Sequence, residues 1–283
     1  MEIRIISEVV SHLGEGPLWS PQTNCVTWTD ITRNLFHTAD ITTGATKSFS
    51  APFMVGAMGL TKDGNYIAAT QKGFARISAG GEFSPLHSFL EHDVRMNDGK
   101  VDPSGRFWAG SLELNFEEGR GSLYVLEKNG SYHSVLDNLS LSNGMGWSPD
   151  GRYFYLIDSI PGVLKRFDFN LSDGLISNPI DLITFDTSSG IPDGMTVSSE
   201  GKIVVALWDG GRVEIYEPTG KKVSEIKLEV SRPTSCTFAG ANRDILVVTS
   251  ASQDIDCILE PMAGKILAIS GTGLSGLPTH QYG

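Results

Sequence analysis

The segment Leu141–Gly151, L-S-N-G-M-G-W-S-P-D-G, decides the fold because its pattern recurs along the chain. Its apolar part predicts a short strand. Ser-Pro-Asp-Gly then predicts a tight turn, since Pro suits the second position, Asp bonds back to the backbone and Gly tolerates a positive φ. The following run Arg152–Asp158, R-Y-F-Y-L-I-D, predicts the second strand of a hairpin.

Five other segments align with the turn that ends at Gly151. They are T-K-D-G ending at Gly64, D-P-S-G at Gly105, S-S-E-G at Gly201, and two weaker copies, S-P-Q-T ending at Thr23 and A-N-R-D around Arg243. Successive turns lie 41, 41, 46, 50 and 42 residues apart, which is typical of propeller blades of four strands. A strand-like run follows each turn: Cys25–Thr29, Tyr66–Thr70, Arg106–Ala109, Tyr153–Ile157, Lys202–Leu207 and Ile245–Thr249.

Six such units account for nearly the whole chain, and closing them into a ring leaves few exposed sheet edges. We therefore predict an all-β fold, a six-bladed β-propeller with four-stranded blades that forms one domain over residues 1–283. The alternating segment Glu2–Val10 is expected to pair with Gly264–Ile269 and close the ring.

One position, about eight residues before each turn, carries a polar side chain in five of the six copies. It holds Glu15, Gly56, Asn97, Asn143, Asp193 and Ser235. In a propeller, residues of equal phase on the innermost strands surround the central channel, so these side chains are expected to meet on the axis. Carboxylate and amide oxygens suit a hard divalent cation, which predicts an axial metal site; Gly56 is expected to leave room for a ligand. The alternative is that Asn, Asp and Gly begin strands for turn reasons alone.

The densest polar cluster, Asp93–Gly110, precedes the strand of the third unit. Arg95 and Asn97 are two residues apart and would share a face of an extended segment, where they could hold substrate oxygens; the alternative for Arg95 is a surface salt bridge. Asp98 and Lys100 are expected to point to the other face and pair locally. Glu113–Gly119 interrupts the strand pattern and predicts a loop at the channel mouth, either in contact with substrate or simply solvated.

Composition narrows the classes of partner. The formal net charge is −11, which argues against a nucleic-acid surface. The start of the chain has acids within its apolar run and no signal-peptide pattern, and no stretch reaches the roughly 18 apolar residues of a membrane helix. The three cysteines, Cys25, Cys236 and Cys257, show no paired spacing. We expect a cytoplasmic protein with no membrane or nucleic-acid partner, either a monomer or a weak homo-oligomer.

These residues resemble the SMP-30/gluconolactonase/regucalcin family over essentially the full length. The matching motifs are G-E-G-P (14–17), R-M-N-D-G-K-V-D-P-S-G-R-F-W (95–108), G-S-L-Y (121–124), S-N-G-M-G-W-S (142–148), I-P-D-G-M (191–195), G-G-R-V (210–213) and T-S-C-T-F-A-G (234–240). The resemblance implies one divalent metal on the axis, with its ligands at Glu15, Asn143 and Asp193. It also implies substrate contacts from Arg95 and Asn97.

One position departs from the family's pattern. Regucalcin-like members carry a substrate-contacting acid where this chain has Asn115, with Glu113 two residues away. Both residues are therefore candidates for substrate contact, but substrate preference does not transfer from the family.

The reaction that the resemblance implies is hydrolysis of a sugar lactone to the aldonic acid. The cation, which is calcium, magnesium, manganese, zinc or iron(II), would polarise the carbonyl. Asp193 would be the catalytic base that deprotonates the attacking water, with metal-bound hydroxide as the alternative. Two other functions stay open: an aryl-ester or phosphotriester hydrolase on the same scaffold, and a non-catalytic calcium-binding or regulatory propeller.

Overall fold

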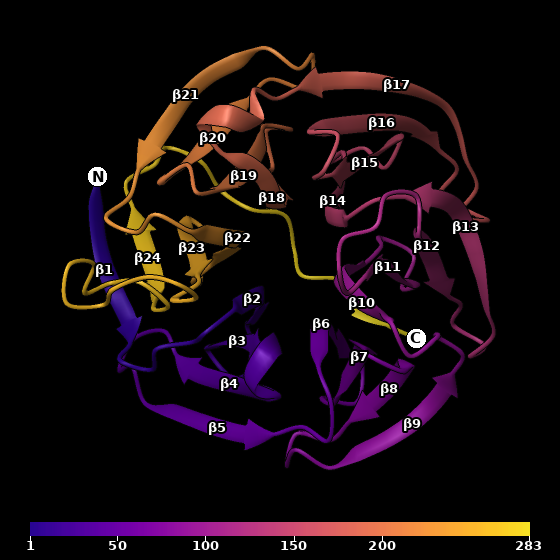
Figure 1. The fold of residues 1–283 in the computed structure, drawn as a ribbon, viewed down its shortest axis with the longest axis horizontal. Coiled ribbons are helices and arrows are strands. Elements are labelled where there is room, and N and C mark those ends of the chain that lie inside the picture. Colours follow the sequence, from indigo (N-terminus) through magenta and orange to yellow (C-terminus); the bar gives the residue numbers. More distant parts are fainter.

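Six β-sheets surround a central axis in the computed structural model, which describes residues 1–283 (Figure 1). Five blades are built from four consecutive antiparallel strands, one of them extended by the short strand β25 beside β6, and the sixth combines three strands from the end of the chain with β1 from its start. The predicted all-β, six-bladed propeller with four-stranded blades is therefore confirmed. No helix of the structure is long and apolar enough to span a bilayer.

In five blades the four consecutive strands run from the axis outwards in chain order; in the sixth, β22, β23 and β24 are followed by β1. The innermost strands are β2 (Gly14–Ser20), β6 (Val55–Thr61), β10 (Val94–Val101), β14 (Ser142–Trp147), β18 (Ile191–Val197) and β22 (Pro233–Ala239). The second strands are β3 (Cys25–Asp30), β7 (Tyr66–Thr70), β11 (Phe107–Glu113), β15 (Tyr153–Asp158), β19 (Ile203–Trp208) and β23 (Ile245–Ser250). The third strands are β4 (Leu35–Asp40), β8 (Gly73–Ile77), β12 (Gly121–Leu126), β16 (Val163–Phe169), β20 (Arg212–Tyr216) and β24 (Ile266–Ser270). The outer strands are β5 (Thr46–Ser50), β9 (Phe83–Ser88), β13 (Tyr132–Leu139), β17 (Ile176–Thr184), β21 (Lys222–Lys227) and β1 (Glu2–Ser7), and two short 3-10 helices lie at Ile31–Arg33 and Thr187–Ser189.

The repeated turn joins the first two strands of a blade, as the hairpin after Leu141 predicted. In the fourth blade Ser148 N–H donates to Tyr153 O, Gly151 N–H donates to Ser148 O, and Gly151 adopts φ +67°. A side chain would strain that conformation, which explains why glycine closes four of the six turns.

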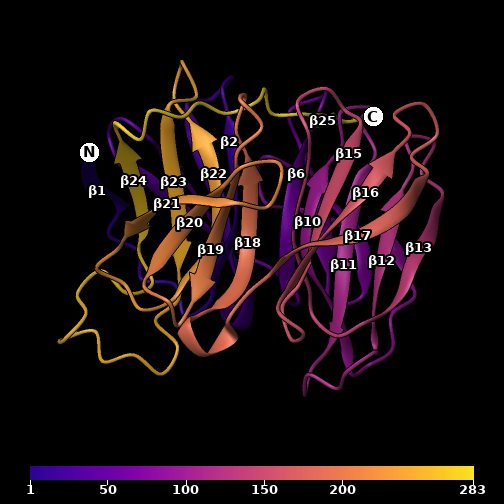
Figure 2. The same cartoon turned by 90° about the horizontal axis from the view of Figure 1, so that it is seen from above.

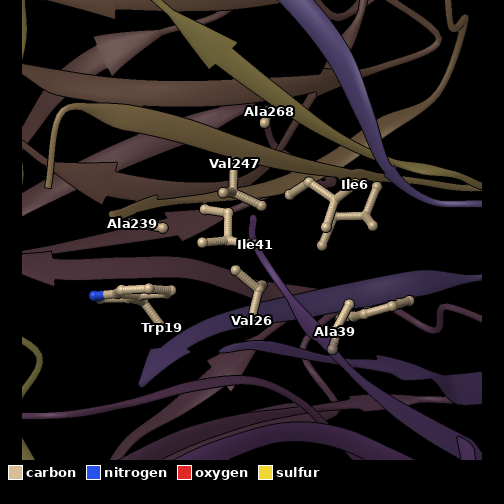
Figure 3. Packing of buried hydrophobic residues seen from close by; sticks show 10 residues of the cluster. Ile6, Trp19, Val26, Ala39, Ile41, Ala239, Val247 and Ala268 are labelled. Atoms are coloured by element: carbon tan, nitrogen blue, oxygen red, sulfur yellow. The ribbon is translucent and has the colours of Figure 1, made fainter. Parts of the chain in front are cut away.

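The ring closes through the predicted pairing of the two chain ends. Strand β1 pairs antiparallel with β24, from Glu2 opposite Ser270 to Ser7 opposite Ile266. A core cluster joins this blade to the first blade, with Ile41 beside Val247 (Figure 3). Burial of these side chains makes the closure a packed interface and not only a pair of hydrogen-bonded strands.

The C-terminal segment was not foreseen from the sequence. After β24 the chain crosses the centre of the ring (Figure 1) and lies along one face of the disc (Figure 2). Ser199 N–H donates to Ser275 O at one end of the crossing, and β25 (Gln281–Tyr282) pairs in parallel with β6 at the other. The residues between them, 277–280, form no hydrogen bond with the blades.

Candidate metal and substrate site

A break in the strand register occurs on every innermost strand at or beside the aligned position. On β10, Met96 pairs with Ser111 and Gly99 with Ala109, so that Asn97 and Asp98 together face Gly110. Two residues likewise face one on β2, β14 and β18, whereas β6 and β22 each insert a single residue. A bulge of this kind redirects side chains and is common beside active sites.

Glycines allow the inner strands to approach one another closely at these bulges. A Cβ atom on Gly144 would lie 2.6 Å from Asp193 O, and one on Gly56 would lie 2.2 Å from Asn97 O. The expectation that Gly56 leaves room for a ligand is therefore wrong: the space is occupied by the backbone of the neighbouring blade.

Three predicted metal ligands, Glu15, Asn143 and Asp193, come from the inner strands of three blades and are buried, with 7%, 4% and 7% of their surface exposed. Asn143 Nδ2 donates to Asp193 Oδ1 at 2.5 Å and to Ser159 Oγ at 3.1 Å. Both amide hydrogens are thus used, and Asn143 Oδ1 is left buried without any partner. An unpaired buried acceptor is costly unless a ligand completes it.

The surroundings of both carboxylates in this cluster disfavour their ionisation. Burial, followed by the charges of Asp193 and Asp98, raises the pKa of Glu15 well above its usual value. Burial also raises the pKa of Asp193, and the hydrogen bond from Asn143 partly opposes that rise. Like charges in a desolvated site favour protonation, and a bound cation would remove that penalty. No group of three His, Cys, Asp or Glu side chains in the structure could hold a metal ion. A cation held by Glu15 and Asp193 would therefore need an amide oxygen such as Asn143 Oδ1 as a third ligand.

Arg95 and Asn97, the predicted substrate contacts, lie beside this cluster and are buried. Arg95 Nη1 donates to Met96 O at 3.0 Å and to Asn97 Oδ1 at 2.8 Å, and Asn97 Nδ2 donates to Ser142 O on the next blade. The alternative of a surface salt bridge for Arg95 is excluded. Burial lowers the pKa of Arg95 to about 10, and the charges of Glu15 and Asp193 oppose that change, so the guanidinium remains charged near neutral pH.

Ser235 was aligned with the axial residues through the weakest turn copy, and the structure corrects this alignment. Pro233 pairs with Ser250 and Ser235 with Thr249, which makes Thr234 the inserted residue of the bulge. The Thr234 hydroxyl is hydrogen-bonded to Gly14 O of the first blade. Ser235 lines a chamber further along the axis, whose lining includes none of Glu15, Asn97, Asn143 and Asp193.

Glu113 and Asn115, the remaining candidates for substrate contact, lie at the end of β11 and in the loop that follows it. The predicted loop is confirmed except that Glu113 is the last residue of the strand. Glu113 accepts hydrogen bonds from Asn115 N–H, Asn115 Nδ2 and Glu117 N–H. Its carboxylate therefore organises the loop, and these bonds lower its pKa, with that from Glu117 contributing most.

The expected local pair between Asp98 and Lys100 is wrong. Asp98 is only 6% exposed, and it forms no ion pair with Lys100, whose Nζ instead donates to Met195 O of another blade at 2.8 Å. Both side chains line one chamber that Asn97 does not reach, and on this strand two consecutive residues opposite Gly110 interrupt the alternation. The sequence signal that could have revealed this is the N-D-G triplet, whose glycine permits the close packing beside Trp108 and Ala109.

Residues 13–252 match the family model described as the SMP-30/gluconolactonase/LRE-like region. The chain belongs to this family. Regucalcin from Gallus gallus is 34% identical, and the match covers 96% of this chain and 95% of the chicken protein. Regucalcin from Danio rerio is 32% identical over 100% of this chain and 98% of its own.

Solved structures agree with the fold. A calcium-binding protein, regucalcin, from Agrobacterium tumefaciens superimposes with a TM-score of 0.95 at 26% identity, over 100% of this chain and 97% of its own. A gluconolactonase from Xanthomonas campestris gives a TM-score of 0.76 at 18% identity, over 94% and 88%, which supports the propeller architecture alone.

Proposed function

We propose that this protein is a metal-dependent lactonase that opens a sugar lactone to the corresponding aldonic acid. The observation that carries the proposal is the buried, unpartnered Oδ1 of Asn143 beside the carboxylates of Glu15 and Asp193. Membership of a family that includes gluconolactonases supports the reaction class, while the substrate and the metal are our inference.

The donor set fits one hard divalent cation. Glu15, Asp193 and Asn143 Oδ1 would hold it, and three oxygen ligands leave coordination positions for water and substrate. The bound cation would supply Lewis-acid polarisation of the lactone carbonyl. Calcium is our first choice because the Agrobacterium neighbour is described as calcium-binding; magnesium, manganese, zinc and iron(II) are the other candidates.

Asp193 is the proposed base. It uses Oδ1 for the hydrogen bond from Asn143, so Oδ2 can accept a proton from the water that attacks the carbonyl carbon. As the ring C–O bond breaks, that proton passes to the ring oxygen, which becomes a hydroxyl group. The carboxylic acid product then ionises and releases one proton to solvent.

Arg95 and Asn97 are the proposed contacts for the hydroxyl groups of the sugar. Both hydrogens on Arg95 Nη1 are used within the protein, which fixes the guanidinium plane. Nη2 and Nε remain as donors, suited to hydroxyl oxygens or to the oxyanion that develops at the carbonyl. A hydroxyl-rich lactone matches these donors better than an apolar aryl ester does.

The proposal is tested with the Asp193→Ala variant. Its rate of proton release from aldonolactones at saturating cation should fall to the spontaneous rate, while circular dichroism retains the propeller signature. Near-normal turnover in this variant would overturn the assignment of the base. A calcium-binding role without catalysis is the second candidate, and tight binding with no turnover of any ester would favour it.

A further inference from the structure

A chamber with a mixed polar and apolar lining lies behind the axial cluster, on the side that the C-terminal segment crosses. Its volume is about 110 Å³, enough for several water molecules. The inner-strand residues that line it follow the axial residues along their strands, as Asp98 follows Asn97 and Gly16 follows Glu15. The segment 276–280 lines its far end.

Asp98 is the acidic side chain of this chamber. The bulge on β10 turns it inward beside Asn97, and its Oδ1 accepts a hydrogen bond from Gly99 N–H at 2.7 Å. Its Oδ2 is buried and has no partner in the protein. At the corresponding second position of the bulge, β2, β14 and β18 carry Pro17, Gly144 and Gly194, so this carboxylate is a feature of one blade and not of the repeat.

Other groups of the chamber can bind water. Trp147 lines it, and its Nε1 donor has no partner. Lys100 also lines it and uses one ammonium hydrogen for Met195 O. The chamber therefore holds one negative and one positive side chain, Asp98 and Lys100. With the indole N–H of Trp147 they supply both hydrogen-bond donors and an acceptor. Ordered water satisfies such a mixed set.

We propose that Asp98 is a positioning residue of the axial site, whose free carboxylate oxygen acts through water held in the chamber and strengthens the retention of the cation. The inference rests on the proposed metal-dependent function and extends it to a residue outside the ligand set. Carboxylates that act on a metal centre through an intervening group commonly contribute 10–100-fold to its affinity.

The electrostatics agree with this role. The charge of Asp98 raises the pKa of both Glu15 and Asp193, so its field reaches the two ligand carboxylates. A negative charge that disfavours ionisation of those ligands must, by the same field, attract a cation between them. Lys100 lies in the same chamber with the opposite charge and should act in the opposite direction.

The test measures calcium affinity of the full-length protein by competition with a fluorescent chelator. The Asp98→Asn variant, which retains the side-chain shape, should bind calcium at least about tenfold more weakly. Lys100→Met should bind it more tightly, a change that simple damage to the fold would not produce. Asp102→Asn is the matched control: Asp102 is fully buried and bound to Arg106 and Trp108, so this variant should lose stability but keep its affinity.

The outcomes separate the two proposals. Suppose that the unsubstituted protein binds calcium. Unchanged affinity in Asp98→Asn, or weaker binding in Lys100→Met, would then overturn the role of Asp98 alone. If Asp98→Asn does not fold, the change in calcium affinity of Lys100→Met decides: tighter binding supports the role of Asp98 and weaker binding overturns it. Failure of the unsubstituted protein to bind calcium, manganese or zinc would overturn the proposed metal-dependent function itself.

Discussion

Asn143 donates a hydrogen bond from Nδ2 to Asp193 Oδ1, 2.5 Å away, between the inner strands of neighbouring blades. This contact holds a carboxylate and an amide in one fixed arrangement, in which Asn143 Oδ1 is buried and has no hydrogen-bond partner. The two blades are thus joined at the point where the proposed chemistry occurs.

Replacing Asn143 by Leu should therefore weaken both binding and stability. We expect at least a tenfold loss of calcium affinity, measured by chelator competition, because one of three ligand oxygens is removed. The free energy of unfolding should fall by about 1–3 kcal/mol as Asp193 and Ser159 lose their partner. Ser159→Ala is the control, since it removes a partner of Asn143 but no ligand; equal calcium affinity in Asn143→Leu and Ser159→Ala would contradict the ligand assignment.

The stability of the chelated protein should depend on pH in a specific direction. The pKa values of Glu15 and Asp193 are raised in the folded state, so the folded protein binds their protons more tightly than the unfolded chain does. Their contribution to stability is present below the unfolded pKa values and is lost as pH rises through the folded ones. The melting temperature should consequently fall as pH rises above about 5.

Two comparisons isolate this effect. Glu15→Gln should show a flatter dependence of melting temperature on pH, because one of the two carboxylates with a raised pKa is gone. Burial lowers the pKa values of His37 and His280, which has the opposite effect on the pH dependence, but their contributions are the same in both proteins. Saturating cation should also flatten the profile, since it binds the deprotonated carboxylates. The prediction is contradicted if the chelated unsubstituted protein and Glu15→Gln show the same dependence of melting temperature on pH between pH 5 and 8.

Asn97→Ala should mainly impair substrate binding. Asn97 fixes the Arg95 guanidinium and links it to Ser142 on the next blade, so its loss frees the group that we expect to hold sugar hydroxyls. A rise in KM of about tenfold, with a smaller change in kcat, is the expected result in steady-state lactone hydrolysis. A variant with unchanged KM and a lost kcat would instead place Asn97 in the chemical step.

Glu113→Gln tests whether Glu113 orders its loop or contacts substrate. Because its carboxylate accepts three hydrogen bonds from the loop, the variant should speed hydrogen exchange at the Asn115 and Glu117 amides. Glu118→Gln, a change in the same loop at an exposed residue, should leave that exchange unchanged. Normal exchange in Glu113→Gln together with an altered lactone preference would favour direct contact.

The fold could be predicted from the sequence because the turn chemistry is local. Ser-Pro-Asp-Gly and its copies specify a hairpin wherever they occur, and their spacing then gives the number of blades. The same phase brought Glu15, Asn97, Asn143 and Asp193 to the axis, where the inner strands indeed carry them. Their roles in binding and catalysis remain predictions.

The bulges explain most of what the sequence could not reveal. Strand alternation predicted a local pair between Asp98 and Lys100, but two residues opposite Gly110 interrupt that alternation and Lys100 instead donates to Met195 O. The single inserted residue Thr234 on β22 moved Ser235 out of the aligned phase. The crossing of the axis by the C-terminal segment depends on contacts with distant blades, such as that between Ser275 and Ser199, and no local pattern encodes it.

The most direct test of the account is proton release on a panel of aldonolactones, measured on chelated protein and again after calcium, magnesium, manganese, zinc or iron(II) is added singly. The account predicts no turnover by the chelated protein and fast ring opening of at least one lactone once a suitable cation is restored. Absence of lactone turnover with every cation would contradict it and leave the axial cluster to another ester or to cation binding alone.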